Sequence, residues 1–211
     1  MTKRTLRILI LAIVAFAAGL LIARGLATGP SRAPRTERAT VLDAPRALPP
    51  LTLVDQDGRP LGPDYFRGHW TLVFFGYTSC PDVCPTTLAM LVNVAKALRD
   101  LPQAERPRVL FVSVDPERDD PARLAAYVRF FDPAFEGATG DAAAVAAAAG
   151  AFGVPYLKVP VPGGAYNMDH GTGIFLVGPG GRLVAYSSAP HDAATLARDY
   201  RSIVLSNGAT S

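Results

Sequence analysis

Three observations on the sequence predict an α/β fold. Apolar strand patterns alternate with helix patterns, a hairpin and a helix end the chain, and both cysteines stand where an apolar strand gives way to a helix. Together they predict a thioredoxin-like sandwich with a central mixed sheet and an added N-terminal hairpin, preceded by a single N-terminal membrane helix. With 211 residues, 49% of them hydrophobic, the chain is long enough for one domain with its own core.

The N-terminus carries an export or membrane signal. A basic tail, residues 1–7, precedes the uncharged run Ile8–Ala23, which as a helix spans about 24 Å, against a hydrocarbon core of about 30 Å. We expect residues 8–24 to be a membrane anchor or uncleaved signal, with residues 1–7 in the cytoplasm and the folded domain on the periplasmic, oxidising side. A signal peptide cleaved after Gly25-Leu26-Ala27 is the alternative.

The first half of the domain is predicted to be a hairpin, a strand and a helix. Residues 25–47 form a linker rich in proline and arginine, and residues 48–211 form the domain. The apolar run Leu51–Val54 before the turn dipeptide Asp57-Gly58 is a hairpin signal. Trp70–Phe75 is continuously apolar, as in a strand buried on both faces. Pro85–Arg99 carries leucines and valines at helical spacing.

The second half of the domain is again predicted to alternate strands with helices. A strand at Val109–Val114 ends at Asp115-Pro116, and a helix follows at Pro121–Phe131. Asp141 is a capping residue for an alanine-rich helix reaching Gly150, because alanine has the highest helix propensity. The remaining expected elements are a loop at Pro155–Gly173, a hairpin of Ile174–Val177 and Arg182–Tyr186, and a helix at Asp192–Leu205.

The run Cys80-Pro81-Asp82-Val83-Cys84-Pro85 holds both cysteines. A proline after each cysteine disfavours helical backbone at Cys80 and Cys84 and makes Pro85 the first helical residue. Cys84 then lies at a helix N-terminus, where negative charge is favoured, so we expect its thiolate to form at lower pH than that of a free cysteine. The run indicates a soft-metal site or a disulfide. A structural disulfide here closes only a short loop and stabilises little.

One of the three histidines is a candidate ligand. His69 precedes a strand and His191 begins a helix, so both read as surface or capping residues. His170 lies in a loop that approaches the dithiol in a thioredoxin-like fold. Two thiolates and one imidazole suit Cu(I), and also Cu(II) with an added oxygen ligand, whereas structural zinc takes four protein ligands. Copper is therefore the expected metal. The net charge of +3 comes from scattered arginines, which excludes a nucleic-acid interface.

Three segments together closely resemble the SCO/SenC family: Gly76–Thr86, Val112–Asp119 and Asp169-His170. The resemblance runs from about residue 48 to 205, and three residues separate the cysteines where thioredoxins have two. It implies a membrane-tethered, thioredoxin-like copper protein that helps build the dinuclear copper centre of cytochrome c oxidase. It further implies that the copper ligands are Cys80, Cys84 and His170. Gly171 departs from the family, since many relatives carry a hydroxyl residue there.

The chemistry leaves more than one function open. A metallochaperone would pass copper by ligand exchange to an oxidase subunit and could meet other copper chaperones or thiol reductants. A thiol-disulfide oxidoreductase would use Cys80 and Cys84 as its redox pair to keep that subunit's cysteines reduced, and a redox sensor would use the same pair as a switch. Asp82, Asp115 and Asp169 can tune thiolate or imidazole charge, although acidic turn residues are usually solvated or capping.

Overall fold

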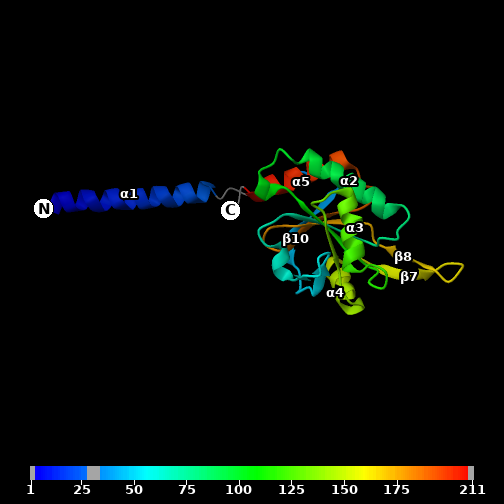
Figure 1. Cartoon of the computed structure of the whole chain (residues 1–211). Helices are drawn as coiled ribbons and strands as arrows, with labels where there is room; N and C mark the ends of the chain where they lie inside the picture. Colours follow the sequence, from blue (N-terminus) through cyan, green and yellow to red (C-terminus); the bar gives the residue numbers. More distant parts are fainter. Residues whose placement is uncertain (1–2, 28–33, 209–211) are drawn as a thin grey trace.

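The computed structural model describes residues 3–27 and 34–208 and has a mixed α/β architecture around one large sheet (Figure 1). Its eight strands follow the order β1-β10-β9-β4-β5-β6-β2-β3, and β7 and β8 form a separate two-stranded sheet. The strands are β1 (Ala39–Ala47), β2 (Leu53–Asp55), β3 (Pro60–Leu61), β4 (Thr71–Gly76), β5 (Arg108–Ser113), β6 (Glu136–Thr139), β7 (Tyr156–Pro160), β8 (Tyr166–His170), β9 (Ile174–Val177) and β10 (Arg182–Ser187). The helices are α1 (Lys3–Ala27), α2 (Val83–Ala97), α3 (Pro121–Phe131), α4 (Ala142–Phe152) and α5 (Ala193–Gly208), with short 3-10 turns at Pro63–Phe66 and Gln103–Glu105.

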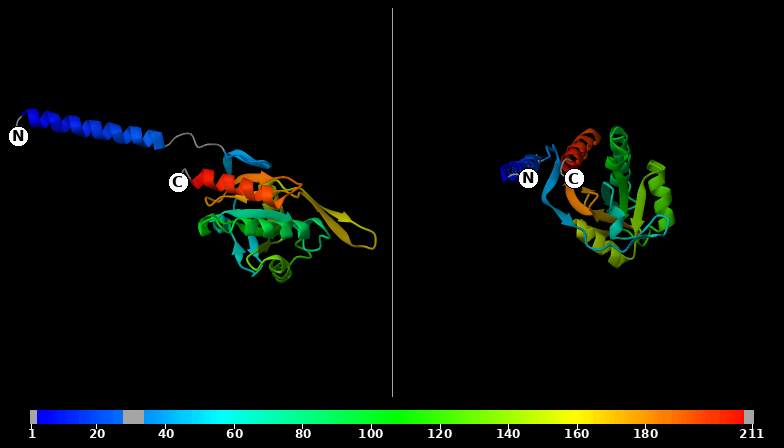
Figure 2. Two further views of the ribbon diagram at one scale, coloured as in Figure 1. Left: turned by 90° about the horizontal axis from the view of Figure 1, so that it is seen from above. Right: turned by 90° about the vertical axis from the view of Figure 1, so that its left-hand side faces the viewer.

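The sheet is mixed and covered on both faces. Strand β4 is parallel to β5 and antiparallel to β9, and every residue of β4 is buried. Successive side chains of a strand point to opposite faces. Leu72 packs beneath α5, whereas the ring of Phe75 lies 5.3 Å from that of Phe152 in α4. Helices α2, α3 and α5 therefore cover one face and α4 the other (Figure 2).

Most of the predicted elements are present. The N-terminal hairpin is β2 and β3, with Leu53 opposite Leu61. The alanine-rich helix is α4, where the carboxylate of Asp141 accepts the N–H of Ala144 at 2.7 Å, and Gly153 ends the helix in the left-handed conformation with φ 72°. These caps explain why a run of alanines forms one defined helix.

The predicted linker over residues 25–47 is wrong in its second half. Ala39–Ala47 is the edge strand β1, which pairs with β10. Its start is fixed by the buried carboxylate of Asp199, which accepts three backbone N–H groups, from Glu37, Arg38 and Ala39, at 2.7–2.9 Å. Because these partners are about 160 residues apart, local sequence patterns give no sign of the strand. Residues 28–33 of the expected linker lie outside the described residues.

Two further predictions need correction. The expected loop Pro155–Gly173 contains the β7–β8 hairpin, which projects from the domain at its edge (Figure 1). Strand β6 was not predicted, because its four residues include a glycine and an alanine and carry little strand signal.

Helix α2 starts at Val83 rather than at Pro85, and Cys84 lies inside its first turn. A proline is tolerated in this turn because the first N–H groups of a helix have no partner within it.

Helix α1 covers the segment expected to be a membrane anchor. In the described parts of the chain, none of the helices reaches the length and apolar character needed to cross a membrane. The anchor stays a prediction.

Candidate metal centre

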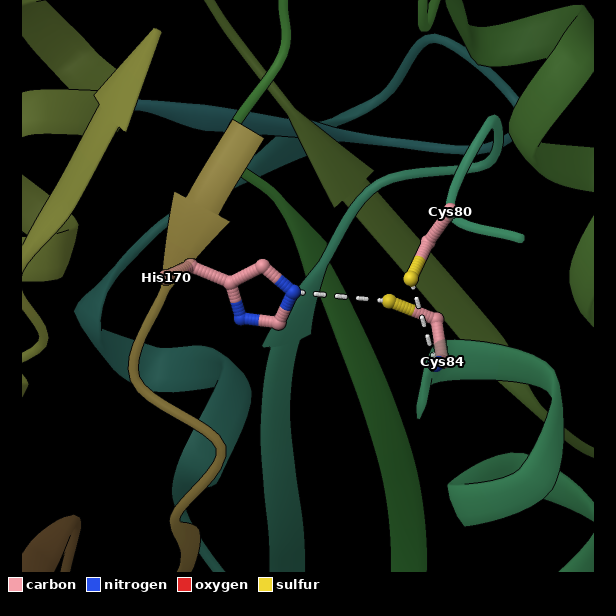
Figure 3. A group of neighbouring side chains, drawn as sticks. All are labelled: Cys80, Cys84 and His170. Carbon is pink, nitrogen blue, oxygen red and sulfur yellow. Dashed lines mark hydrogen bonds between the residues drawn. The ribbon is translucent and has the colours of Figure 1, made fainter. Parts of the chain in front are cut away.

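Cys80, Cys84 and His170 come together at the carboxyl end of β4, where one ligand atom from each lies within 4.8 Å of the others (Figure 3). Strand β4 ends at Gly76, the chain turns through Cys80, and α2 brings Cys84 back beneath it. His170 is the last residue of β8 and enters from the hairpin on the other side. The structure therefore brings together the three residues expected to be ligands, and their binding of a metal stays a prediction.

The imidazole of His170 is held with one nitrogen free for a metal. Its Nδ1 donates a hydrogen bond to the carbonyl oxygen of Gly171 at 3.0 Å, which leaves the lone pair on Nε2. Nε2 faces the Sγ atom of Cys84 at 3.5 Å. The rings of Tyr77 and Phe74 stand edge-on to the imidazole, with centroids at 5.9 and 6.3 Å, and fix its plane. Gly171, the departure from the family pattern, thus contributes through its backbone.

Both cysteines are free thiols in the structure. Cys84 is fully buried and Cys80 is half-buried, and the N–H of Cys84 contacts the Sγ atom of Cys80 at 3.5 Å. Burial raises the pKa of the Cys84 thiol well above its ordinary value. The expectation of an easily formed thiolate at Cys84 is therefore wrong, because the desolvation of the sulfur outweighs the favourable field of the helix N-terminus.

The donor set and its spacing fit a soft cation. Metal bonds of about 2.3 Å to sulfur and about 2.0 Å to imidazole, at a three-coordinate centre, separate the two donors by about 3.7 Å. The 3.5 Å between Cys84 Sγ and His170 Nε2 is close to this value. A cation bound here would also compensate the buried thiolate charge that the apolar surroundings oppose. Thiolate and imidazole are ligands that Cu(I) favours.

The loop before Cys80 is held by a buried carboxylate. Asp119, fully buried, accepts hydrogen bonds from the backbone N–H and the hydroxyl of Thr78 and from the hydroxyl of Ser113. Arg123 completes the cluster by donating to the hydroxyls of Thr78 and Ser79 at 2.7 and 3.0 Å. These contacts join the cysteine loop to β5 and α3, so they help to position Cys80.

The hairpin that carries His170 is attached to the domain through Tyr166. Its hydroxyl donates to the buried carboxylate of Asp115 at 2.8 Å, and burial and this contact raise the pKa of Tyr166 to about 12. Arg118 donates to the same carboxylate and to the carbonyl of Tyr166, and its guanidinium lies 3.8 Å from the centre of the Tyr166 ring. Lys158 pairs with Glu117 at 2.6 Å. Two side chains of the hairpin, Tyr166 and Lys158, and three of the domain thus fasten the hairpin.

The other candidates occupy separate places. His69 precedes β4, at the opposite end of that strand from the cysteines. His191 donates from Nε2 to the carbonyl of Thr172 at 2.7 Å and so braces the loop after His170. Asp82 and Asp169 are exposed and line the recess over the cluster. Asp115 fastens the hairpin instead.

Sequence reasoning missed the roles of Asp119, Arg118 and Tyr166. The signal for two of them was the polar run directly after the buried strand β5.

Comparison with known proteins agrees with this geometry. The family model described as SCO1/SenC matches residues 40–205. The mouse mitochondrial SCO2 homolog is 37% identical over 152 residues, which cover 72% of this chain and 60% of the mouse protein. The structure of Bradyrhizobium japonicum ScoI with copper bound has 39% identity and a TM-score of 0.66, over 74% of this chain and 98% of that one. The structure of Arabidopsis thaliana ScoI with copper bound has 28% identity and a TM-score of 0.69, over 76% of this chain and 98% of that one.

The family match covers most of the chain, and solved relatives hold copper within the same fold. The Cys–Cys–His cluster supplies soft donors for that metal, so we assign copper as the metal of this chain. The chain belongs to the SCO1/SenC family.

Proposed function

We propose that this protein is a copper metallochaperone that binds Cu(I) through Cys80, Cys84 and His170 and delivers it for assembly of the dinuclear copper centre of cytochrome c oxidase. The observation that carries the proposal is the convergence of two thiols and one imidazole within 4.8 Å, next to a recess that Cys80 and His170 line. The oxidase as destination is supported by the family resemblance. The fold that presents the site is, on this proposal, thioredoxin-like.

Three donors suit a carrier better than a permanent metal site. A centre with three protein ligands keeps a side open, where a ligand from a recipient can join before a ligand of the carrier leaves. The recess over the cluster, about 400 Å³, gives such access. Copper is then the cargo, and the chain's residues hold its donors in place: the Gly171 carbonyl orients the imidazole, and Asp119 holds the cysteine loop.

The test is His170→Ala at limiting copper, with His69→Ala as the matched control. The variant removes one donor and leaves both thiols, so it should retain less copper and support little oxidase carrying its dinuclear centre. Added copper should partly restore assembly, because mass action offsets a weakened site. His69→Ala should behave like the parent. Normal assembly by stably expressed His170→Ala protein at limiting copper would exclude the copper-carrier role.

A second candidate function is thiol-disulfide exchange with the same recipient. It is favoured by the two free thiols and by the contact between the Cys84 N–H and the sulfur of Cys80 at 3.5 Å. Oxidation of both thiols to one disulfide would supply the two electrons and two protons that reduce a disulfide in the recipient. This activity needs no imidazole. If it is the essential one, Cys80→Ser and Cys84→Ser fail to assemble oxidase while His170→Ala succeeds.

We also propose that residues 8–24 anchor the chain, with the domain on the periplasmic side. The support is the uncharged run Ile8–Ala23 between basic residues. Membrane fractionation with N-terminal sequencing tests it. Recovery of the protein in the soluble fraction with Thr28 as its first residue would contradict the anchor and leave the copper chemistry unaffected.

A further inference from the structure

Exposed apolar side chains gather around the open side of the metal centre. Outside α1, the described residues include five exposed large hydrophobic side chains, and three of them surround this site. Val83 (42% exposed) and Val159 (37%) line the recess over the cluster, and Leu157 (66%) lines an adjoining hollow of about 240 Å³ that reaches His170. Such clustering over a reactive site is typical of a surface that another molecule covers.

The hairpin directs this apolar surface away from the domain. Side chains of a strand alternate between its faces, so Leu157 and Val159 share one face of β7 and Lys158 lies on the other. Lys158 is held against Glu117, which fixes the side of the hairpin that turns inward. Opposite Leu157 and Val159 stand Asp169 and Asn167 of β8, both exposed. The outward face is thus apolar along β7 and polar along β8.

The charged side chains around the site are carboxylates. Of the described residues that line the recess or the adjoining hollow, the charged ones are Asp82 and Asp169, and no lysine or arginine is among them. Basic side chains of the neighbouring elements are engaged elsewhere: Lys158 with Glu117, Arg118 with Asp115, and Arg123 with Thr78 and Asp119. A partner that approaches the metal therefore meets apolar side chains beside two carboxylates.

We propose that Val83, Leu157 and Val159, with Asp82 and Asp169, form the docking surface for the copper-binding domain of the recipient, and we call these five residues the rim. The inference rests on the proposed function. Ligand exchange requires a recipient donor within about 2.3 Å of copper while the carrier still holds the metal. The recipient must then sit on the residues that surround the open side. It meets the rim with apolar side chains and with at least one basic group next to its copper ligands.

The experiment measures Cu(I) transfer from the purified full-length chain to the purified apo copper-binding domain of the cytochrome c oxidase subunit from the same organism. The double variant Leu157→Ser/Val159→Ser removes apolar contact and leaves Cys80, Cys84 and His170 unchanged. Phe130→Ser and Leu205→Ser are matched controls, since both side chains are exposed on helices away from the rim. We expect the double variant to lower the second-order transfer rate about tenfold, with Cu(I) affinity unchanged. The controls should stay within about twofold of the parent.

The carboxylates are tested separately through salt dependence. Asp82→Asn/Asp169→Asn should slow transfer at low ionic strength about threefold or more and match the parent in high salt, because long-range steering is screened. Equal rates for the rim variants and the parent would overturn the docking surface while leaving copper transfer established. A parent that transfers no copper to this domain would overturn the proposed function and the rim together.

Two other results would also overturn the rim. One is a loss of Cu(I) affinity in the double variant itself, which would make the hairpin face part of the metal site. The other is a parent dimer, seen in sedimentation, that the variants dissociate without changing the transfer rate.

Discussion

The sulfur of Cys84 occupies the space that a side chain on Gly76 would need. A Cβ atom at Gly76 would stand 2.7 Å from that sulfur and 2.7 Å from the ring of Phe111. The last residue of β4 must therefore be glycine for the first turn of α2 to place its thiol against the sheet. The position of one proposed copper ligand thus depends on the absence of a methyl group on a neighbouring strand.

Gly76→Ala should consequently weaken copper binding. The added methyl group must displace the sulfur, the ring or the strand, at a cost of about 1–3 kcal/mol in stability. We expect Cu(I) affinity to fall at least tenfold in a competition titration against a Cu(I) chelator. Gly150→Ala, in α4 with no described atom within 4 Å of the new methyl group, is the control and should keep the copper affinity, with stability equal to the parent's or up to about 1 kcal/mol higher because alanine favours a helix. Parent-like affinity for Gly76→Ala would show that the sulfur position is not limiting.

The apo-protein should lose stability as pH rises above about 8.5. The pKa of the Cys84 thiol is raised in the folded state, so the unfolded chain ionises first, near the ordinary thiol value of about 8.5. Folding is then penalised progressively between pH 8.5 and 9.5, before tyrosines ionise. Urea unfolding followed by circular dichroism under reducing conditions measures this, and Cys84→Ser should flatten the dependence. An unchanged slope in that variant would assign the effect to other groups.

Asp119→Asn should damage the metal centre. The amide keeps the size of the side chain but cannot accept all of the hydrogen bonds from Thr78 and Ser113, which the carboxylate satisfies. We expect a loss of about 2–4 kcal/mol in stability and a fall in Cu(I) affinity of about tenfold or more. Asp199→Asn is the matched control, since it is equally buried and accepts three N–H groups away from the site. It should lose stability and keep its copper affinity. Equal copper affinity in both variants would limit Asp119 to a structural role.

Tyr127→Phe should be neutral or stabilising by up to about 1 kcal/mol. The hydroxyl of Tyr127 is buried without a hydrogen-bond partner among the described residues, and its removal relieves an unsatisfied polar group. The ring stays in place between Phe111 and Phe131, with centroids at 5.5 and 5.4 Å. Thermal unfolding measures the change. A loss of more than about 1 kcal/mol would indicate that the hydroxyl has a partner after all.

The sequence was informative where the signal is local. The apolar run of β4, the capping Asp141 and the cysteine spacing each depend on a few adjacent residues, and the structure contains the corresponding features. The grouping of His170 with the cysteines needed more, because 86 residues separate it from Cys84. For that histidine the family resemblance supplied what spacing alone could not.

The predictions that were wrong concern features that depend on residues far apart in the sequence. Strand β1 looks like a linker because Pro45 and Arg46 interrupt its pattern, and it is held by Asp199 near the other end of the chain. The helix N-terminus predicts a lowered pKa for the Cys84 thiol, whereas burial raises that pKa, and no local pattern in the sequence reveals the burial. The acceptor role of Asp119 likewise follows from folding that brings residues 78, 113 and 119 together.

The separation of the β7–β8 hairpin from the main sheet divides the three proposed copper ligands between two structural units. The cysteines belong to the core, whereas His170 belongs to an arm attached by Tyr166, Lys158 and their partners. Swinging that arm outward would leave the hydrogen bonds between the eight strands intact, but it would break the contacts of Tyr166 and Lys158 and expose the buried side chain of Met168. These contacts therefore hold the imidazole of His170 beside the two thiols. The position of the imidazole thus depends on the hairpin, whereas the positions of the two sulfur atoms depend on the core of the domain.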